Sequence, residues 1–378
     1  MDRKISILFM PDDIACTKEK TPLMLQSVLF CPILTWMCLE LAGLGVERLF
    51  IVSDVKVHEQ MRPYVPAGMD VTFVDGANHA RELLSLLENE QGEAIVVNGV
   101  VLPVGVFSGG AVYRAPTQAC CDVLREHGAF AAFPKGVEIM KGFLPVGDGE
   151  ELRATQAMCR QKILEKHLSR DVIVMDPNTT YIDPRVKIGA GTTILPGTIL
   201  RGETVIGENC MIGPNAMVNA CTVGDETTIN ASQTNESRIG SHTTVGPFAY
   251  VRPGSTIGDH VRVGDFVEIK NSVIGDGTKV SHLTYIGDSD VGERINFGCG
   301  TVTTNYDGFK KYRCTIEDDA FIGCNTNLIA PVTVGKGSYI AAGSTITDDV
   351  PEDALAVARS KQTNKERWAA RRRKLFGE

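Results

Sequence analysis

Hydrophobic and polar positions alternate along this chain in two different ways. From Lys4 to about Arg170, short apolar runs occur at 5–9, 48–52, 71–74 and 94–97. Helical patterns at 32–41, 80–90 and 150–168 lie between or after these runs. Strands that alternate with helices favour an α/β domain, and a parallel sheet is its simplest topology.

Beyond Asp171 an aliphatic residue followed by glycine recurs with a period of six, for example at Val245, Ile257 and Val263. A small or β-branched residue stands two positions earlier, and both point inward because alternate strand residues share a face. Glycine, aspartate and asparagine lie between the short strands and accept the dihedral angles of a corner. Strands of a β-sandwich recur about every 8–12 residues, so the pattern instead predicts a parallel β-helix with three strands per coil.

These patterns divide the chain into an α/β domain of nucleotidyltransferase-like (Rossmann-like) type at 1–170, a β-helix at 171–348 and a carboxy-terminal arm at 349–378. The interior of a β-helix is thin, and its flat outer faces tend to pack against neighbours. A homotrimer is therefore expected.

Composition narrows the classes of partner. A net charge of -8 argues against nucleic-acid binding, which requires a cationic surface. The apolar run at 5–10 is too short for a signal peptide or a membrane span, so we expect no membrane partner and a cytoplasmic location. Eleven cysteines without a Cys-x-x-Cys pair predict neither a disulfide framework nor a zinc site. Small molecules or proteins remain as partners.

The hexapeptide pattern stops between Cys299 and Asp319, and interruptions of a rigid solenoid often carry sites. Arg252, Lys270 and Lys311 flank or enter this break and suit a phosphate monoester, although any single one could equally be solvated on an outer face. His282 could act as a base near neutral pH, and the alternative for this residue is a surface corner.

Five segments carry a resemblance to a known family. They are Gly-Pro-Phe-Ala-Tyr-Val-Arg-Pro-Gly (246–254), Phe-Val-Glu-Ile-Lys (266–270), His-Leu-Thr-Tyr-Ile-Gly-Asp (282–288), Asn-Tyr-Asp-Gly (305–308) and Ala-Pro-Val-Thr-Val-Gly (330–335). Residues 246–368 resemble the acetyltransferase domain of the bifunctional N-acetylglucosamine-1-phosphate uridyltransferase/glucosamine-1-phosphate acetyltransferase family. The resemblance implies a left-handed β-helix, a trimer with active sites between subunits, and transfer of acetyl from acetyl-CoA to glucosamine 1-phosphate. Such a reaction serves UDP-N-acetylglucosamine and cell-envelope precursor synthesis and requires no metal.

The resemblance also implies a role for individual residues. His282 matches the general base. The sugar-phosphate contacts match Arg252, Lys270, Tyr285, Asn296 and Lys311. The acetyl-CoA contacts match Asn305, Tyr306, Ala342 and Arg359. Cys299 and Cys324 lie beside the expected thioester, where the family usually has Ala and Ser; for Cys324 the favoured interpretation is a core thiol rather than a nucleophile.

The amino-terminal domain departs from the family. The family begins with a glycine-rich loop for a triphosphate, whereas residues 9–18 contain no glycine. The family also places a metal-binding aspartate after a later strand, whereas Asn98-Gly99 follows the strand at 94–97. The domain is therefore expected to be a shortened, degenerate nucleotidyltransferase without uridylyl transfer.

Three alternatives stay open at this stage. They are a full bifunctional enzyme, a non-catalytic β-helix scaffold or regulatory subunit, and a γ-class carbonic anhydrase. The last requires three zinc-binding histidines, and His242, His260 and His282 lack the paired spacing of such ligands.

Overall fold

The structure is a computed structural model of the chain and describes residues 4–11, 21–104 and 110–377. The chain divides into two compact units. The first contains residues 1–209 with 217–220, and the second contains residues 210–216 with 221–378.

The first unit begins with a six-stranded sheet. Its strands, in spatial order, are β5 (Asp70–Asp75), β4 (Arg48–Ser53), β1 (Ile5–Phe9), β6 (Glu93–Asn98), β8 (Val112–Pro116) and β9 (Glu138–Ile139). The first four are parallel to one another, as the sequence predicts, whereas β8 is antiparallel to both of its neighbours, β6 and β9, so the sheet is mixed. Ile7 and Leu8 of β1 point to opposite faces of the sheet and are 0% and 1% exposed, which fits a central strand covered on both faces.

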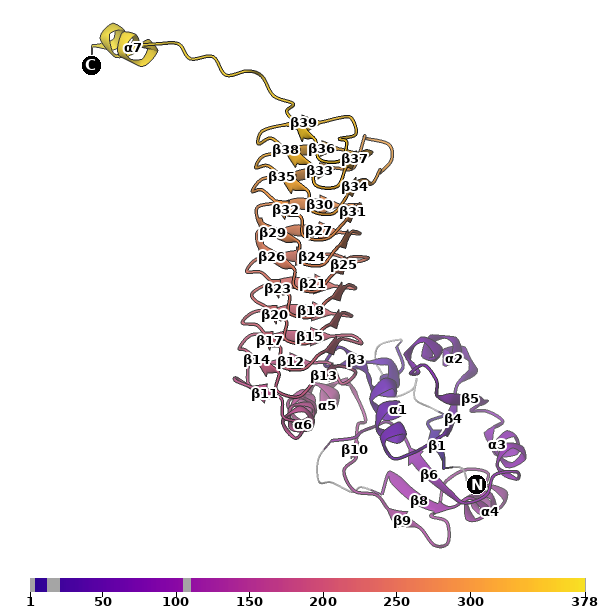
Figure 1. Cartoon of the computed structure of the whole chain (residues 1–378). Coiled ribbons are helices and arrows are strands. Elements are labelled where there is room, and N and C mark those ends of the chain that lie inside the picture. Colours follow the sequence, from indigo (N-terminus) through magenta and orange to yellow (C-terminus); the bar gives the residue numbers. More distant parts are fainter. Residues whose placement is uncertain (1–3, 12–20, 105–109, 378) are drawn as a thin grey trace. The chain divides into compact units, whose positions relative to one another are not determined.

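Helices and two short strand pairs complete the α/β part (Figure 1). They are α1 (Ile33–Gly43), α2 (Val55–Met61), α3 (His79–Leu87), α4 (Thr117–His127), α5 (Gly149–Ala154), α6 (Gln156–Leu168), the 3-10 turns η2 (Leu23–Leu25) and η3 (Arg62–Tyr64), β2 (Ser27–Val28) with β3 (Cys31–Pro32), and β7 (Val101–Leu102) with β10 (Leu144–Pro145). The single helix predicted at 150–168 is interrupted at Thr155, whose hydroxyl donates to the Leu152 carbonyl at 2.7 Å. Such local side-chain bonds compete with regular helix geometry.

Hexapeptide coils follow in the same unit. Their strands are β11 (Ile173–Val174), β12 (Tyr181–Ile182), β13 (Lys187–Ile188), β14 (Thr193–Ile194), β15 (Ile199–Arg201), β16 (Val205–Ile206) and β18 (Met217–Asn219). Three parallel ladders join β11 to β14, β12 to β15 and β18, and β13 to β16.

The second unit is a parallel β-helix with three sheets (Figure 1). The first sheet contains β17 (Met211–Ile212), β20 (Thr228–Ile229), β23 (Thr244–Val245), β26 (Arg262–Asp265), β29 (Lys279–His282), β32 (Asn296–Phe297), β35 (Phe321–Ile322), β38 (Tyr339–Ile340) and β40 (Leu355–Ala356). The second sheet contains β21 (Gln233–Asn235), β24 (Tyr250–Val251), β27 (Glu268–Lys270), β30 (Tyr285–Gly287), β33 (Val302–Thr304), β36 (Asn327–Ile329) and β39 (Thr345–Ile346). The third sheet contains β19 (Thr222–Val223), β22 (Arg238–Ile239), β25 (Thr256–Ile257), β28 (Val273–Ile274), β31 (Ser289–Val291), β34 (Cys314–Ile316) and β37 (Val332–Val334).

The predicted inward positions are the core of this helix. Val263 and Ile269 are fully buried, and Val261 and Val267, two residues earlier, are 1% exposed. Glycine after the aliphatic residue allows close stacking, because a Cβ added to Gly240 would lie 2.5 Å from the Gly258 carbonyl carbon. We call the turn from the first sheet to the second the first corner, that from the second to the third the second corner, and that from the third back to the first the third corner.

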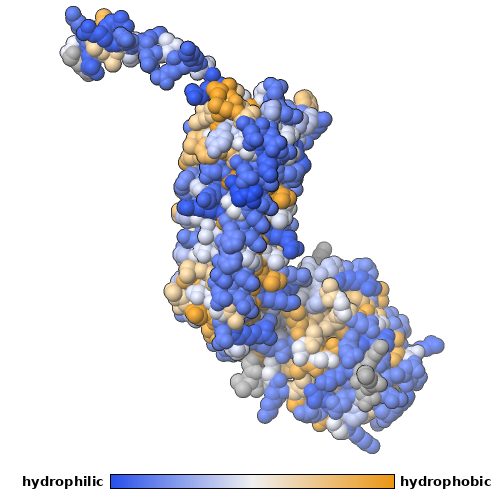
Figure 2. All heavy atoms as spheres, in the orientation of Figure 1, coloured by the Kyte–Doolittle hydropathy of each residue, from blue (hydrophilic) through white to orange (hydrophobic). Residues whose placement is uncertain are grey.

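The arm after the last coil ends in α7 (Trp368–Phe376). None of the α7 residues is buried, and Figure 2 shows the arm as a largely hydrophilic surface.

Candidate functional site

His282 ends β29 at the first corner and pairs with an acidic residue of the preceding coil. Asp265 stands in register with His282, and its Oδ1 lies 2.6 Å from His282 Nδ1. The hydrogen bond to His282 is the main cause of a lowered pKa of Asp265. Because a carboxylate only accepts, Nδ1 donates to Asp265, and in the neutral imidazole the lone pair is then on Nε2. His282 therefore has a free basic nitrogen.

Sequence reasoning missed Asp265. The signal was available in principle, since Asp265 precedes His282 by 17 residues, which is one coil of this helix.

Three more of the predicted residues stack over His282 at the first corner. Four residues of the first sheet lie in register in successive coils: Val280, Phe297, Ile322 and Ile340. The corner residue comes two positions after each of them. The residues that follow them at the corner are His282, Cys299, Cys324 and Ala342. With coils about 4.8 Å apart, this first-corner column rises about 14 Å from His282 to Ala342.

Arg359 lies at the end of this column. A Cβ added to Gly343, the residue after Ala342, would lie 3.8 Å from Arg359 Cδ. The chain is held there because the backbone N–H of Ala358 donates to Ser344 Oγ at 3.2 Å.

A second group of the predicted residues converges at the second corner. Lys270 Nζ lies 3.3 Å from Asp288 Oδ2, and Asn305 Nδ2 donates to the same oxygen. Asn305 Nδ2 also lies 3.5 Å from Tyr285 Oη. Burial raises the pKa of Asp288, but hydrogen bonds from Asn271, Lys270 and Asn305 outweigh burial and lower it. Asp288 was also missed by sequence reasoning, since nothing in the hexapeptide pattern marks it.

Two further cations extend this second-corner cluster. The nearby side chain of Lys270 is the main cause of a lowered pKa of Lys311. Arg252 stands in the coil before Lys270 and also lowers the pKa of Lys311. Its guanidinium is 2.7 Å from Glu268, which is the main cause of a raised pKa of Arg252. Mutual repulsion among these cations would be relieved by a bound anion.

The break in the repeat forms a small loop after Asn305. Tyr306 and Lys311 form an isolated antiparallel bridge, and Tyr306 Oη donates to the Gly308 carbonyl at 2.6 Å. The side chain of Asp307 accepts the backbone N–H groups of Phe309 and Lys310, each at 2.8 Å. The loop thus holds Tyr306 and Lys311 next to Asn305.

Asn296 lies apart from the second-corner cluster. It begins β32 of the first sheet and pairs with Lys279 and Phe321, whereas Lys270 ends a strand of the second sheet. Within one chain the predicted residues therefore lie in three places: the first-corner column, the second-corner cluster, and Asn296 on the first sheet.

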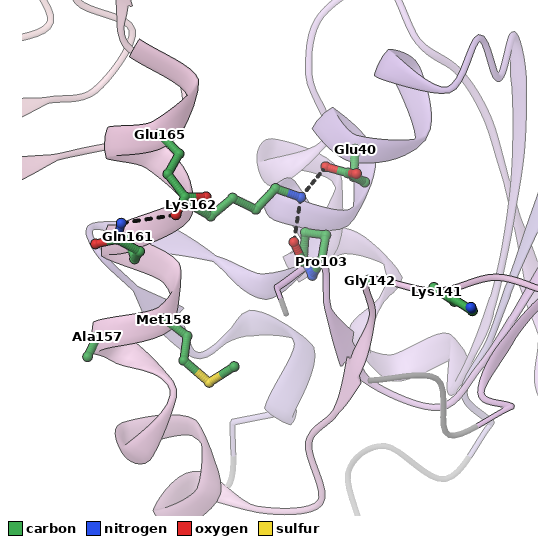
Figure 3. A pocket seen from close by; sticks show the side chains of 9 residues that line it. All are labelled: Glu40, Pro103, Lys141, Gly142, Ala157, Met158, Gln161, Lys162 and Glu165. Atoms are coloured by element: carbon green, nitrogen blue, oxygen red, sulfur yellow. Dashed lines mark hydrogen bonds and ion pairs between the residues drawn. The ribbon is translucent and has the colours of Figure 1, made fainter. Parts of the chain in front are cut away.

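The first unit contains a cavity of about 620 Å³ (Figure 3). Its lining residues are Glu40, Pro103, Lys141, Gly142, Ala157, Met158, Gln161, Lys162 and Glu165. Lys162 points across it and bonds to Glu40 at 2.8 Å and to the Pro103 carbonyl. Of the glycine-free stretch 9–18, residues 12–18 lie outside the described residues. Asn98, at the end of β6, donates to the Phe130 carbonyl at 3.4 Å.

Two absences hold for residues 4–11, 21–104 and 110–377. No helix there is long and apolar enough to cross a membrane. Nor does that part of the chain gather three or more His, Cys, Asp or Glu side chains into a group that could hold a metal ion.

Two hexapeptide families match the chain. The family described as bacterial transferase hexapeptide (six repeats) matches residues 236–271 and 313–348, and the hexapeptide repeat of succinyl-transferase matches residues 203–231. The fold class predicted from the sequence is therefore confirmed: an α/β part followed by a left-handed parallel β-helix of hexapeptide repeats.

Curated relatives carry the name bifunctional protein GlmU. The protein of Clostridium perfringens (strain SM101 / Type A) is 56% identical over 230 residues, which are 61% of this chain and 51% of the relative. That of Geobacillus sp. (strain WCH70) is 50% identical over 250 residues, or 66% of this chain and 54% of the relative. The chain spans about half the length of the curated relatives it matches. The predicted resemblance to this family is confirmed over about 60% of the chain.

Among solved structures, an Arabidopsis UDP-N-acetylglucosamine acyltransferase has a TM-score of 0.37 at 20% identity. The match covers 53% of this chain and 75% of that chain.

Proposed function

We propose that the β-helix transfers the acetyl group of acetyl-CoA to the amine of glucosamine 1-phosphate, with His282 as general base. The observation that carries this proposal is the pair formed by His282 and Asp265 at the foot of the first-corner column. The relatives named bifunctional protein GlmU support an acetyltransferase role in UDP-N-acetylglucosamine synthesis.

In this mechanism Nε2 of His282 removes a proton from the attacking amine, because Nδ1 is bound to Asp265. The amine attacks the thioester carbonyl, the carbon–sulfur bond breaks, and the CoA thiolate leaves. Asp265 keeps the imidazole in the required tautomer and stabilises the imidazolium that forms.

The first-corner column suits the extended arm of acetyl-CoA. Cys299, Cys324 and Ala342 rise in line from the base over about 14 Å, and Arg359 at the end provides a cation for the CoA phosphates. The interpretation of Cys324 as a core thiol is wrong, because Cys324 is exposed; Cys299 is partly exposed. Direct transfer to the amine requires no covalent intermediate, so neither thiol is assigned a nucleophilic role.

The second-corner cluster suits the phosphate of the sugar. Lys270, Lys311 and Arg252 bring three cations together, and an anion would replace their mutual repulsion with attraction. The proposal assigns Tyr285 to the sugar and Asn305 with Tyr306 to acetyl-CoA.

A complete site is proposed to combine two copies of the chain in a homotrimer. Asn296 stands on a different sheet from the second-corner cluster, and the proposal is that a second copy supplies it. Large apolar side chains also remain exposed beside His282. Phe248 and Phe266 stack with ring centroids 5.5 Å apart, and Leu283 follows them at the same corner. Exposed apolar side chains of this kind favour association.

The amino-terminal domain is proposed to have lost uridylyl transfer. Asn98 stands at the end of β6, where an acidic residue was expected, and its amide already donates to the Phe130 carbonyl. No other activity is proposed for this domain.

A thiol-release assay with acetyl-CoA and glucosamine 1-phosphate tests the proposed function. Wild-type protein is expected to release CoA, and His282→Ala to lose at least a hundredfold in kcat, the usual range for a general base. His260→Ala is the matched control, because His260 stacks on His242 at the third corner and should keep full activity. Absence of CoA release from the wild type would refute the function.

A further inference from the structure

Asp288 is a nearly buried acid at the second corner, and the coil fixes its position. It is 5% exposed and has a left-handed backbone with φ of 48°. Its N–H donates to the Lys270 carbonyl at 2.9 Å, and its own carbonyl accepts the Cys314 N–H at 3.2 Å. The carboxylate therefore has little freedom to move.

Three donors from two neighbouring coils converge on this carboxylate. Oδ1 accepts Asn271 Nδ2 at 2.6 Å, while Oδ2 accepts both Lys270 Nζ at 3.3 Å and Asn305 Nδ2. A buried carboxylate is costly unless it is paired and hydrogen-bonded, and here both oxygens have donors. Its removal would release Lys270 and Asn305 together.

The carboxylate also sets the direction of the Asn305 amide. A carboxylate can only accept, so Asn305 must turn Nδ2 toward Asp288, and its Oδ1 is then directed away as an acceptor. Lys270 gives one of three ammonium protons to Asp288 and keeps the others for an anion.

We infer that Asp288 is a positioning residue that holds Lys270 for the sugar phosphate and Asn305 for acetyl-CoA at the same time. Asp288 itself touches neither substrate. It couples the two substrate subsites, because one buried group orients a side chain of each. The inference rests on the proposed acetyl transfer.

Asp288→Asn tests this coupling with little change in size. The new amide carries no charge to attract Lys270. Its Nδ2 is itself a donor and therefore cannot accept the hydrogen bonds that one carboxylate oxygen accepts in the wild type. The KM values for glucosamine 1-phosphate and for acetyl-CoA are each expected to rise about tenfold, with a smaller change in kcat. Asp319→Asn is the matched control, since Asp319 is another left-handed corner residue, with φ of 60°, and bonds to Arg294 at 2.7 Å. Both KM values should stay within twofold in the control.

A variant cycle separates positioning from a general structural role. In a Lys270→Gln background, Asp288→Asn should no longer raise the KM for the sugar phosphate but should still raise that for acetyl-CoA. An Asn305→Ser background should give the reverse pattern. If Asp288→Asn does not fold, the pair Lys270→Gln and Asn305→Ser replaces it, and non-additive KM changes are expected because Asp288 joins the two residues.

The outcomes distinguish this inference from the proposed function. Wild-type protein that releases no CoA would refute the proposed function. Normal wild-type turnover would refute the role of Asp288 alone if both KM values were unchanged in Asp288→Asn. A lowered kcat of Asp288→Asn with unchanged KM values would also refute the role of Asp288, because such a change reports only a smaller folded fraction. Additive effects in the cycle would also overturn the coupling.

Discussion

Asp265→Asn is the sharpest test of the proposed base. The substitution keeps the size of the side chain and removes the charge that His282 Nδ1 meets at 2.6 Å. An amide can also donate to Nδ1, which would favour the tautomer whose proton is on Nε2. A fraction of the protein would then have no free base directed at the amine.

The size of the effect follows from exposure. In a buried Ser-His-Asp triad the same substitution lowers kcat about 10⁴-fold. Here the side chains of His282 and Asp265 are 52% and 38% exposed, so water replaces much of the lost interaction. We therefore expect kcat to fall about tenfold, with the KM for both substrates nearly unchanged.

The assay is CoA release under saturating acetyl-CoA and glucosamine 1-phosphate. Glu226→Gln is the matched control, because Glu226 lies 3.2 Å from His242 Nδ1 in a similar pair at the third corner. It should keep wild-type kcat. Wild-type kcat in Asp265→Asn, in a protein that His282→Ala inactivates, would refute the orienting role of Asp265.

Three further predictions concern assembly, stability and the amino-terminal domain. Chains with Lys270→Gln or Asn296→Ala should each be impaired alone but should regain CoA release when they are coexpressed, because a mixed trimer contains some intact intersubunit sites. No gain on coexpression would contradict a site shared between subunits. Burial lowers the pKa of His167 to about 4 from 6.5, so the neutral imidazole stabilises the fold above pH 6.5. This contribution to the free energy of unfolding, about 3 kcal/mol, is lost as pH falls from 6.5 to 4. Urea unfolding at pH 7.5 and at pH 5 should reveal part of the loss. The difference between the two pH values should be smaller in His167→Leu. Finally, no pyrophosphate should form from UTP and N-acetylglucosamine 1-phosphate, and its appearance would restore the full bifunctional enzyme.

The sequence alone predicted the repeating parts of the fold. Val263 and Ile269 are buried where the period of six places them, because each strand repeats the same inward and outward alternation. In the α/β part the apolar runs predicted four strands correctly, but not β8, which runs antiparallel to its neighbours β6 and β9. Strand direction depends on how the chain returns to the sheet, and local hydrophobicity does not encode this return.

The candidate site was predicted residue by residue from motifs, whereas its partners came from the fold. Asp265 and His282 are 17 positions apart. Cys299 and Cys324 occupy the same column but are 25 positions apart, because the loop after Asn305 lengthens that coil. Neighbours in a β-helix are set by the number of residues in each coil, which motif spacing alone does not give.

The sequence by itself determined that the chain forms hexapeptide coils and that His282, Lys270 and Asn305 stand near their interruption. Only the tertiary structure decided that Asp265 holds the base, that Asp288 joins Lys270 to Asn305, and that Asn296 lies on a different sheet. The physical reason is that side-chain hydrogen bonds act across stacked coils over about 3 Å, and the stacking of coils brings together residues that are distant in sequence.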